Sequence, residues 1–117
     1  DFCDYRKVVG CWKFKNRDFS RIELSDTDFV YADPPYDVEF TTYARGGFTW
    51  DDQVRTAEWL VQHSGPVILV NQATPRIKAL YRRLGFRVQY LDAPRRISSS
   101  GDRTPAREVF ATRNIKL

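Results

Sequence analysis

Two continuous apolar runs dominate the hydrophobic pattern of the chain. Phe29–Ala32 and Val67–Val70 are both short, rich in β-branched or aromatic residues, and bounded by turn-forming residues. Such runs are typical of strands that are buried on both faces of a parallel sheet. Each run is followed by a loop and then by apolar residues at helical spacing, so the pattern predicts an α/β fold.

Two helices are expected at about residues 51–63 and 75–84. Thr49 offers a capping hydroxyl with an acid three residues later, and Thr74–Pro75 offers a cap followed by a first-turn proline. Gly85 supplies the usual stop signal after the second helix. The apolar stripe of each helix is assigned to the core.

Alternating polar and apolar positions predict further strands. Phe86–Leu91 and Arg107–Thr112 alternate, and they are expected to form the arms of a long β-hairpin whose connection is residues 92–106. Cys11–Phe14 alternates weakly and is also expected to be a strand. The predicted architecture is a mostly parallel sheet with an antiparallel hairpin at one edge and helices packed on it.

Composition limits the class of protein. A length of 117 residues, 42% of them hydrophobic and 15% aromatic, fits one globular domain with one core rather than a disordered chain. No apolar run approaches the ~18 residues that a membrane span needs. The net charge of +4 favours a polyanionic partner, although many basic domains bind nothing acidic.

Cysteine and histidine usage argues against a metal site. Cys3 and Cys11 do not form a Cys-x-x-Cys pair, and His63 is the only histidine, so no zinc site is expected. His63 and Trp59 are interpreted as packing or surface residues. Two thiols without a signal peptide suit the reducing cytoplasm, which is the expected location.

The turn after the first apolar run carries the strongest candidate chemistry. Asp33-Pro34-Pro35-Tyr36 ends the strand because proline cannot donate to a ladder, so Asp33 lies where open α/β sheets place their ligand sites. A carboxylate and a backbone carbonyl can each accept one N–H of an exocyclic amine and localise its lone pair. Tyr36 can stack on a base that has left its duplex. The plain alternative is an ordinary strand end with a proline-rich turn.

Two loops and one turn offer further candidates. Residues 37–48 contain aromatics and glycines, which suits either a binding loop or a simple surface loop. Asp18 is best explained locally as a turn or capping residue. The hairpin connection, residues 92–106, spaces arginines with small hydroxyl residues, which suits phosphate contact. Its alternatives are a solvated loop, or arginines that pair with Asp92 or Asp102.

Taken in order, these motifs resemble the carboxyl-terminal half of the Dam-type (D12 class) DNA adenine-N6 methyltransferases. Asp-Pro-Pro-Tyr after an apolar strand is the catalytic motif of that family. Phe40, Tyr43 and Phe48 lie at the family's aromatic spacing, and Arg96-Ile97-Ser98-Ser99 resembles its hairpin motif. The resemblance covers roughly residues 12–114.

The resemblance implies a partial Rossmann-like methyltransferase fold and methyl transfer from S-adenosyl-L-methionine to adenine N6 in DNA, a reaction also used in restriction–modification. The residues it implies for the reaction are Asp33, Pro34, Pro35 and Tyr36. The residues it implies for the cofactor are Asp18, Phe19 and Asp33. The residues it implies for contact with DNA and its flipped adenine are Tyr43, Arg95, Arg96, Ser98 and Arg103.

The chain also departs from the family pattern. The family's Phe-x-Gly-x-Gly cofactor loop, its acidic ribose contact and its target-recognition domain have no counterpart in residues 1–117. Gly10 and Gly46-Gly47 do not substitute, because neither follows a strand and opens a helix. The chain is therefore expected to be a single, incomplete catalytic domain that associates with the missing amino-terminal half or with itself.

Two other classes of function stay open at this point. One is an RNA or small-molecule amino-methyltransferase that uses the same turn after Asp33. The other is a non-catalytic nucleic-acid-binding module in which only the arginine hairpin acts.

Overall fold

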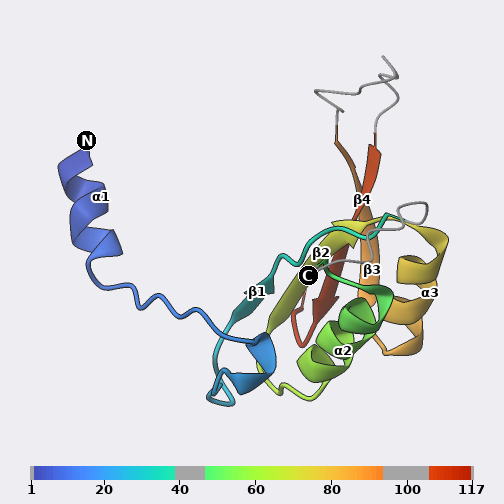
Figure 1. Cartoon of the computed structure of the whole chain (residues 1–117), viewed down its shortest axis with the longest axis horizontal. Coiled ribbons are helices and arrows are strands. Elements are labelled where there is room, and N and C mark those ends of the chain that lie inside the picture. The colour runs from blue at the N-terminus through green and yellow to red at the C-terminus, as the bar shows by residue number, and fades with distance from the viewer. Residues whose placement is uncertain (1, 39–46, 94–105, 117) are drawn as a thin grey trace.

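The described residues form a four-stranded sheet with two helices packed against it and a third helix that stands apart (Figure 1). The computed structural model describes residues 2–38, 47–93 and 106–116. Their elements, in chain order, are α1 (Phe2–Val9), the 3-10 helix η1 (Phe19–Arg21), β1 (Val30–Ala32), α2 (Trp50–Val61), β2 (Val67–Gln72), α3 (Pro75–Arg83), β3 (Arg87–Ala93) and β4 (Ala106–Arg113).

The strand order is β1-β2-β4-β3. β1 runs parallel to β2, with Val30 opposite Val67, and β4 pairs antiparallel with both β2 and β3. A partial Rossmann-like sheet with an antiparallel hairpin at one edge is thereby confirmed. The sheet of the described residues is mixed, and its parallel share is smaller than expected because β4 runs opposite to the strands on both of its sides.

Both expected helices begin at the capping residues that the sequence indicates. Thr49 accepts the Asp52 N–H at 3.2 Å, and the Asp52 carboxylate accepts the Thr49 N–H at 3.0 Å, which completes a capping box for α2. Thr74 caps α3 by accepting the Ile77 N–H at 3.3 Å, with Pro75 in the first turn. Gly85 follows α3 with φ +88°, a left-handed conformation that favours glycine.

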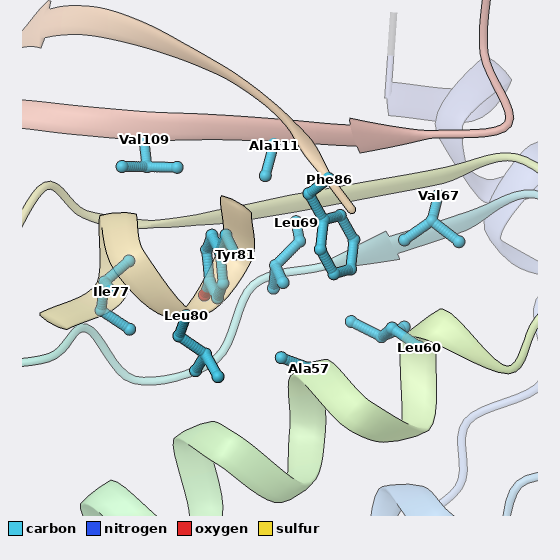
Figure 2. Close-up of a cluster of buried hydrophobic side chains, with 10 residues drawn as sticks. All are labelled: Ala57, Leu60, Val67, Leu69, Ile77, Leu80, Tyr81, Phe86, Val109 and Ala111. Carbon is cyan, nitrogen blue, oxygen red and sulfur yellow. The ribbon is translucent and has the colours of Figure 1, made fainter. Parts of the chain in front are cut away.

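The core lies between the helices and one face of the sheet (Figure 2). Alternate strand residues share a face, so Leu69 and Ala111, which are paired in register, point to the same side as Val67 and Val109. The buried cluster consists of these four residues with Ala57, Leu60, Ile77, Leu80, Tyr81 and Phe86. The other face contributes no member of the cluster, and its Tyr31 is 58% exposed.

The first part of the chain differs from the sequence prediction. Cys11–Phe14 is not a strand, and Trp12 and Phe14 are 58% and 78% exposed. The prediction was wrong because weak alternation does not make a strand without a neighbour to complete its hydrogen bonds, and no described strand pairs with this segment. The helix α1 was not predicted. No helix in the described ranges is long and apolar enough to span a bilayer.

Candidate active site

The turn Asp33–Tyr36 directly follows β1, at the carboxyl end of that strand. Because β1 and β2 are parallel, their carboxyl ends lie at one edge of the sheet, where β2 ends in Asn71 and Gln72. Asp37, the residue after the turn, is linked to the end of β2 by a hydrogen bond from its N–H to Asn71 Oδ1 at 2.8 Å. The turn therefore sits where parallel sheets bind their ligands.

A cavity of about 650 Å³ opens beside this turn. It is lined by the segment before β1, by β1 and the turn that follows it, and by α2 with the two residues Gly47 and Phe48 that precede it. Its lining includes Asp18, Phe19, Asp33, Pro34 and Pro35. The volume suits a nucleoside-sized ligand, since small-molecule sites usually enclose about 300–1,000 Å³. The structure thus brings the residues expected for the cofactor and most of those expected for catalysis to one cavity.

Asp18 caps the short helix η1 and also forms an ion pair with α2. Its carboxylate accepts the Ser20 N–H at 3.0 Å, and Arg55 donates to both of its oxygens at 2.9 and 3.0 Å. Hydrogen bonds from Arg55, and then from the Ser20 hydroxyl, hold the pKa of Asp18 well below its usual range. Asp18 therefore has the capping role that its local sequence indicates and still faces the cavity as an ionised acceptor.

Aromatic and cationic groups form the wall next to Asp18. The Arg55 guanidinium lies 4.3 Å from the centre of the Phe19 ring, and the Phe19 and Trp59 ring centres are 5.4 Å apart. Flat rings of this kind suit stacking against a nucleobase. Sequence reasoning assigned Trp59 to packing, and it does pack on Phe19, but it also lines the cavity.

Tyr36 lies on the other side of the turn and does not line the cavity. Its hydroxyl donates to Glu108 of β4 at 3.4 Å, and 36% of its surface is exposed. Burial, followed by the negative charges of Glu108 and Asp33, raises the pKa of Tyr36 to about 12. The phenol therefore stays neutral at physiological pH and is tied to the hairpin.

Several site residues escaped the sequence analysis. Arg55, Thr56 and Trp59 present one face of α2 to the cavity, and Gln53 donates to the Pro35 carbonyl at 2.7 Å. The sequence does indicate that some of these residues share a helix face, because Asp52, Thr56 and Trp59 recur at helical spacing. What that face packs against is not readable from spacing.

The residues predicted for DNA contact lie outside the described ranges. They are Tyr43, Arg95, Arg96, Ser98 and Arg103. The strands on both sides of the arginine segment are described, and they pair as the expected hairpin, with Asp92 opposite Arg107. Arg107 donates to the Asp92 carboxylate at 3.3 Å. Of the aromatic series after the turn, Phe48 is described and lines the cavity.

Comparison with known proteins places this geometry in context. A family model described as D12 class N6 adenine-specific DNA methyltransferase matches residues 4–97. Retron Ec67 DNA adenine methylase of Escherichia coli is 43% identical over 88 residues, which is 72% of this chain and 30% of that protein.

Two further relatives agree. DNA N-6-adenine-methyltransferase of Escherichia phage P1 is 34% identical over 103 residues, which is 80% of this chain and 14% of that protein. Type II methyltransferase M1.LlaDCHI of Lactococcus lactis subsp. cremoris is 32% identical over 111 residues, which is 86% of this chain and 38% of that protein. The chain thus spans well under half the length of the relatives it matches.

Proposed function

The chain belongs to the D12 class N6 adenine-specific DNA methyltransferases, and on that premise we propose that it acts in transferring a methyl group from S-adenosyl-L-methionine to the N6 amine of adenine in DNA. The observation that carries this proposal is the position of Asp33, Pro34 and Pro35 at the end of β1, on the wall of a nucleoside-sized cavity. The names of the relatives support adenine in DNA as the substrate.

The turn supplies two acceptors for the amine. Gln53 already occupies the Pro35 carbonyl, so the Pro34 carbonyl is the one offered to a base, together with the Asp33 carboxylate. Two accepted N–H bonds hold the amine pyramidal and direct its lone pair, and they strengthen as positive charge builds on nitrogen. When bound, S-adenosyl-L-methionine supplies an electrophilic methyl carbon on sulfur. The amine proton leaves to water or to the carboxylate.

The cofactor side of the cavity is assigned to Asp18 and Phe19. An ionised carboxylate accepts an exocyclic amine or a hydroxyl of a nucleoside, and the Phe19 ring, which carries the Arg55 guanidinium over one face, adds apolar surface to the same wall. Asp18 is held ionised by Arg55, so this acceptor does not depend on pH in the neutral range. The fit of these groups to an adenosine moiety supports S-adenosyl-L-methionine as the methyl donor.

The DNA side is assigned to the segments after the turn and within the hairpin. A target adenine must leave the duplex to reach Asp33, and Tyr36 and Tyr43 are the rings assigned to stack on it. Arg95, Arg96, Ser98 and Arg103 are assigned to the phosphate backbone. Because the proposed substrate is cellular DNA, the protein is further proposed to act in the cytoplasm.

The chain is further proposed to work with an amino-terminal half that provides the glycine-rich cofactor loop and the target-recognition domain, or to associate with itself. The support is the aromatic pair Trp12 and Phe14, whose ring centres are 6.1 Å apart and which are 58% and 78% exposed. Exposed aromatic side chains of this kind are typical of contacts with another protein surface. Sedimentation that shows a monomer at every concentration would argue against self-association.

The function is tested by methyl transfer to DNA. The chain is assayed alone and joined to the part of a relative that it does not span, with methyl-labelled S-adenosyl-L-methionine and duplex DNA. Mass spectrometry of the digested product is expected to show N6-methyladenine. Methylation of RNA or a small molecule instead, or salt-sensitive DNA binding without cofactor binding by the joined protein, would overturn the proposal.

A further inference from the structure

Two buried side-chain amides bracket Tyr36. Gln53 of α2 donates to the Pro35 carbonyl at 2.7 Å, and Asn71 of β2 accepts the Asp37 N–H at 2.8 Å. The amides are joined to each other, because Asn71 Nδ2 donates to Gln53 Oε1 at 2.9 Å. The backbone groups immediately before and after Tyr36 are therefore held by one connected pair of side chains, which we call the amide clamp.

The clamp is fixed from behind by the core. Asn71 is 0% exposed and Gln53 is 3% exposed, and Asn71 also donates to the buried hydroxyl of Tyr81 at 3.0 Å. Leaving a buried amide without its hydrogen-bond partner lowers the stability of the folded protein. Each hydrogen bond of this connected series therefore favours the geometry that the next one needs. The side-chain amides of Gln53 and Asn71 are thus each held in one orientation.

A second anchor holds the end of the same turn. The Asp37 side chain is 4% exposed, accepts the Thr74 hydroxyl at 2.7 Å, and pairs with the guanidinium of Arg76 through Nε at 2.8 Å and through Nη2. Arg76 in turn lies 4.5 Å from the centre of the Trp50 ring. Asp37 is therefore held at its N–H by the clamp and at its carboxylate by the start of α3.

The prolines explain why the turn uses these particular groups. Pro34 and Pro35 have no N–H, so a carbonyl and the N–H groups that follow are what remains for anchoring. The Pro35 carbonyl and the Asp37 N–H are both taken by the clamp, while Asp33 and Pro34 line the cavity. Neither Gln53 nor Asn71 lines the cavity, so they do not reach a ligand bound there.

We propose that Gln53 and Asn71 are positioning residues, which orient the acceptors on one side of the turn and the Tyr36 ring on the other without touching the base. This rests on the proposed function in one respect, since the geometry they set matters for methyl transfer. A displacement of about 1 Å in a reacting group costs roughly 100-fold in rate. Loss of the clamp is therefore expected to slow the chemical step and leave cofactor affinity unchanged.

The experiment compares Gln53→Met and Asn71→Leu with Thr112→Val, a matched control. Thr112 is buried, 2% exposed, and pairs with Ile68 near the start of β2, away from the turn. Each protein is joined to the part of a relative that it does not span. The two readouts are the single-turnover rate per cofactor-binding molecule and the exchange rate of the Asp37 amide measured by NMR.

Both clamp variants are expected to lose about 10- to 100-fold in the single-turnover rate, with cofactor affinity within about twofold of wild type. Asn71→Leu is expected to speed Asp37 exchange at least tenfold relative to the Val109 amide in β4, and Gln53→Met to speed it less. Thr112→Val is expected to change neither the single-turnover rate nor the exchange rate of the Asp37 amide. Where Asn71→Leu does not fold, Gln53→Met decides.

Two results would overturn the proposal that Gln53 and Asn71 are positioning residues. One is a single-turnover rate, per molecule that binds cofactor, within about twofold of wild type in both variants. The other is an amide hydrogen-exchange rate at Asp37 that rises only as much as the rate at Val109, because equal increases indicate destabilisation of the whole fold. If wild type transfers no methyl group to DNA, the proposed function fails by itself. Selective exchange at Asp37 then decides whether the clamp holds the turn.

Discussion

The Tyr36 hydroxyl donates to the Glu108 carboxylate at 3.4 Å, and this contact joins the turn after β1 to β4 across 72 residues of sequence. It gives the ring a tether at its polar end, while the amide clamp holds the backbone at its other end. The long distance indicates a weak bond that orients the ring more than it stabilises the fold.

Tyr36→Ala is expected to weaken binding of a flipped adenine, because base–aromatic stacking contributes roughly 1–3 kcal/mol. Tyr36→Phe keeps the ring face and loses only the contact with Glu108, so it should be milder. Fluorescence of DNA with 2-aminopurine at the target position measures both. Equal losses in the two variants would assign the effect to the hydroxyl instead of the ring.

The stability of the fold is expected to fall above pH 10 in part because of Tyr36. Its pKa in the folded protein is raised to about 12, whereas the pKa of a tyrosine in an unfolded chain is about 10. In that window the unfolded chain loses its phenolic proton and the folded chain keeps it. The contribution of Tyr36 is therefore full below about pH 10 and is lost as pH rises toward 12.

Denaturant unfolding of wild type and Tyr36→Phe at a series of alkaline pH values isolates this effect. Tyr81, whose pKa is raised mainly by burial and to a lesser extent by the Tyr36 phenol, acts in the same direction in both proteins, so the burial part of its effect cancels in the comparison. Wild type should lose stability faster than Tyr36→Phe between pH 10 and 12. Parallel curves would show that the Tyr36 phenol titrates normally.

Asp33→Ala is expected to abolish methyl transfer. An acceptor that acts chiefly as charge develops contributes on the order of 3–4 kcal/mol to the barrier, or a few hundredfold in rate. Cofactor binding should change far less. Glu58→Ala, which removes a carboxylate from the exposed side of α2, is the matched control. Near-normal turnover in Asp33→Ala would remove this residue from the reaction.

Asp18→Ala is expected to weaken binding of S-adenosylhomocysteine about tenfold, since hydrogen bonds to charged groups are among the stronger ones. Asp18 also holds Arg55, so the comparison variant is Arg55→Ala. Calorimetric titration should rank Asp18→Ala as the more damaging change if the carboxylate contacts the ligand. The reverse ranking, or equal losses, would make Asp18 only a support for Arg55.

Arg95→Ala, Arg96→Ala and Arg103→Ala are each expected to weaken binding to all DNA sequences about equally. Each phosphate contact contributes close to −0.9 to the slope of log affinity against log salt, so each variant should flatten that slope. Base discrimination should survive, because phosphate contacts position the protein without reading sequence. Arg87→Ala, in β3, is the control for net charge. Unchanged slopes in all three variants would exclude the hairpin from the DNA interface.

Local patterns predicted the elements with strong local causes. The runs Phe29–Ala32 and Val67–Val70 became adjacent parallel strands, and the caps at Thr49 and Thr74 began the helices. The expected burial of the first run was wrong, because β1 lies at the edge of the described sheet and Phe29 and Tyr31 are each 58% exposed. The turn at Asp33 reached the expected edge because a proline pair ends a strand wherever it occurs. In each of these cases the information lies within a few residues.

Partners distant in sequence were not predictable in the same way. Asp18 meets Arg55, and Asp37 meets Arg76, across 37 and 39 residues. Both acids carry ordinary turn signals, and nothing in their spacing announces an ion pair. Cys11–Phe14 shows the opposite error, since its alternation predicted a strand that no described neighbour completes.

The contacts that hold the turn after β1 come, within the described residues, from positions later in the chain: Gln53, Asn71, Thr74, Arg76 and Glu108. The helix α1 stands apart from the sheet (Figure 1). A gene exchange with a breakpoint between residues 10 and 16 would leave each of these contacts intact. The turn and the residues that hold it can therefore be inherited as one block by genes whose upstream parts differ.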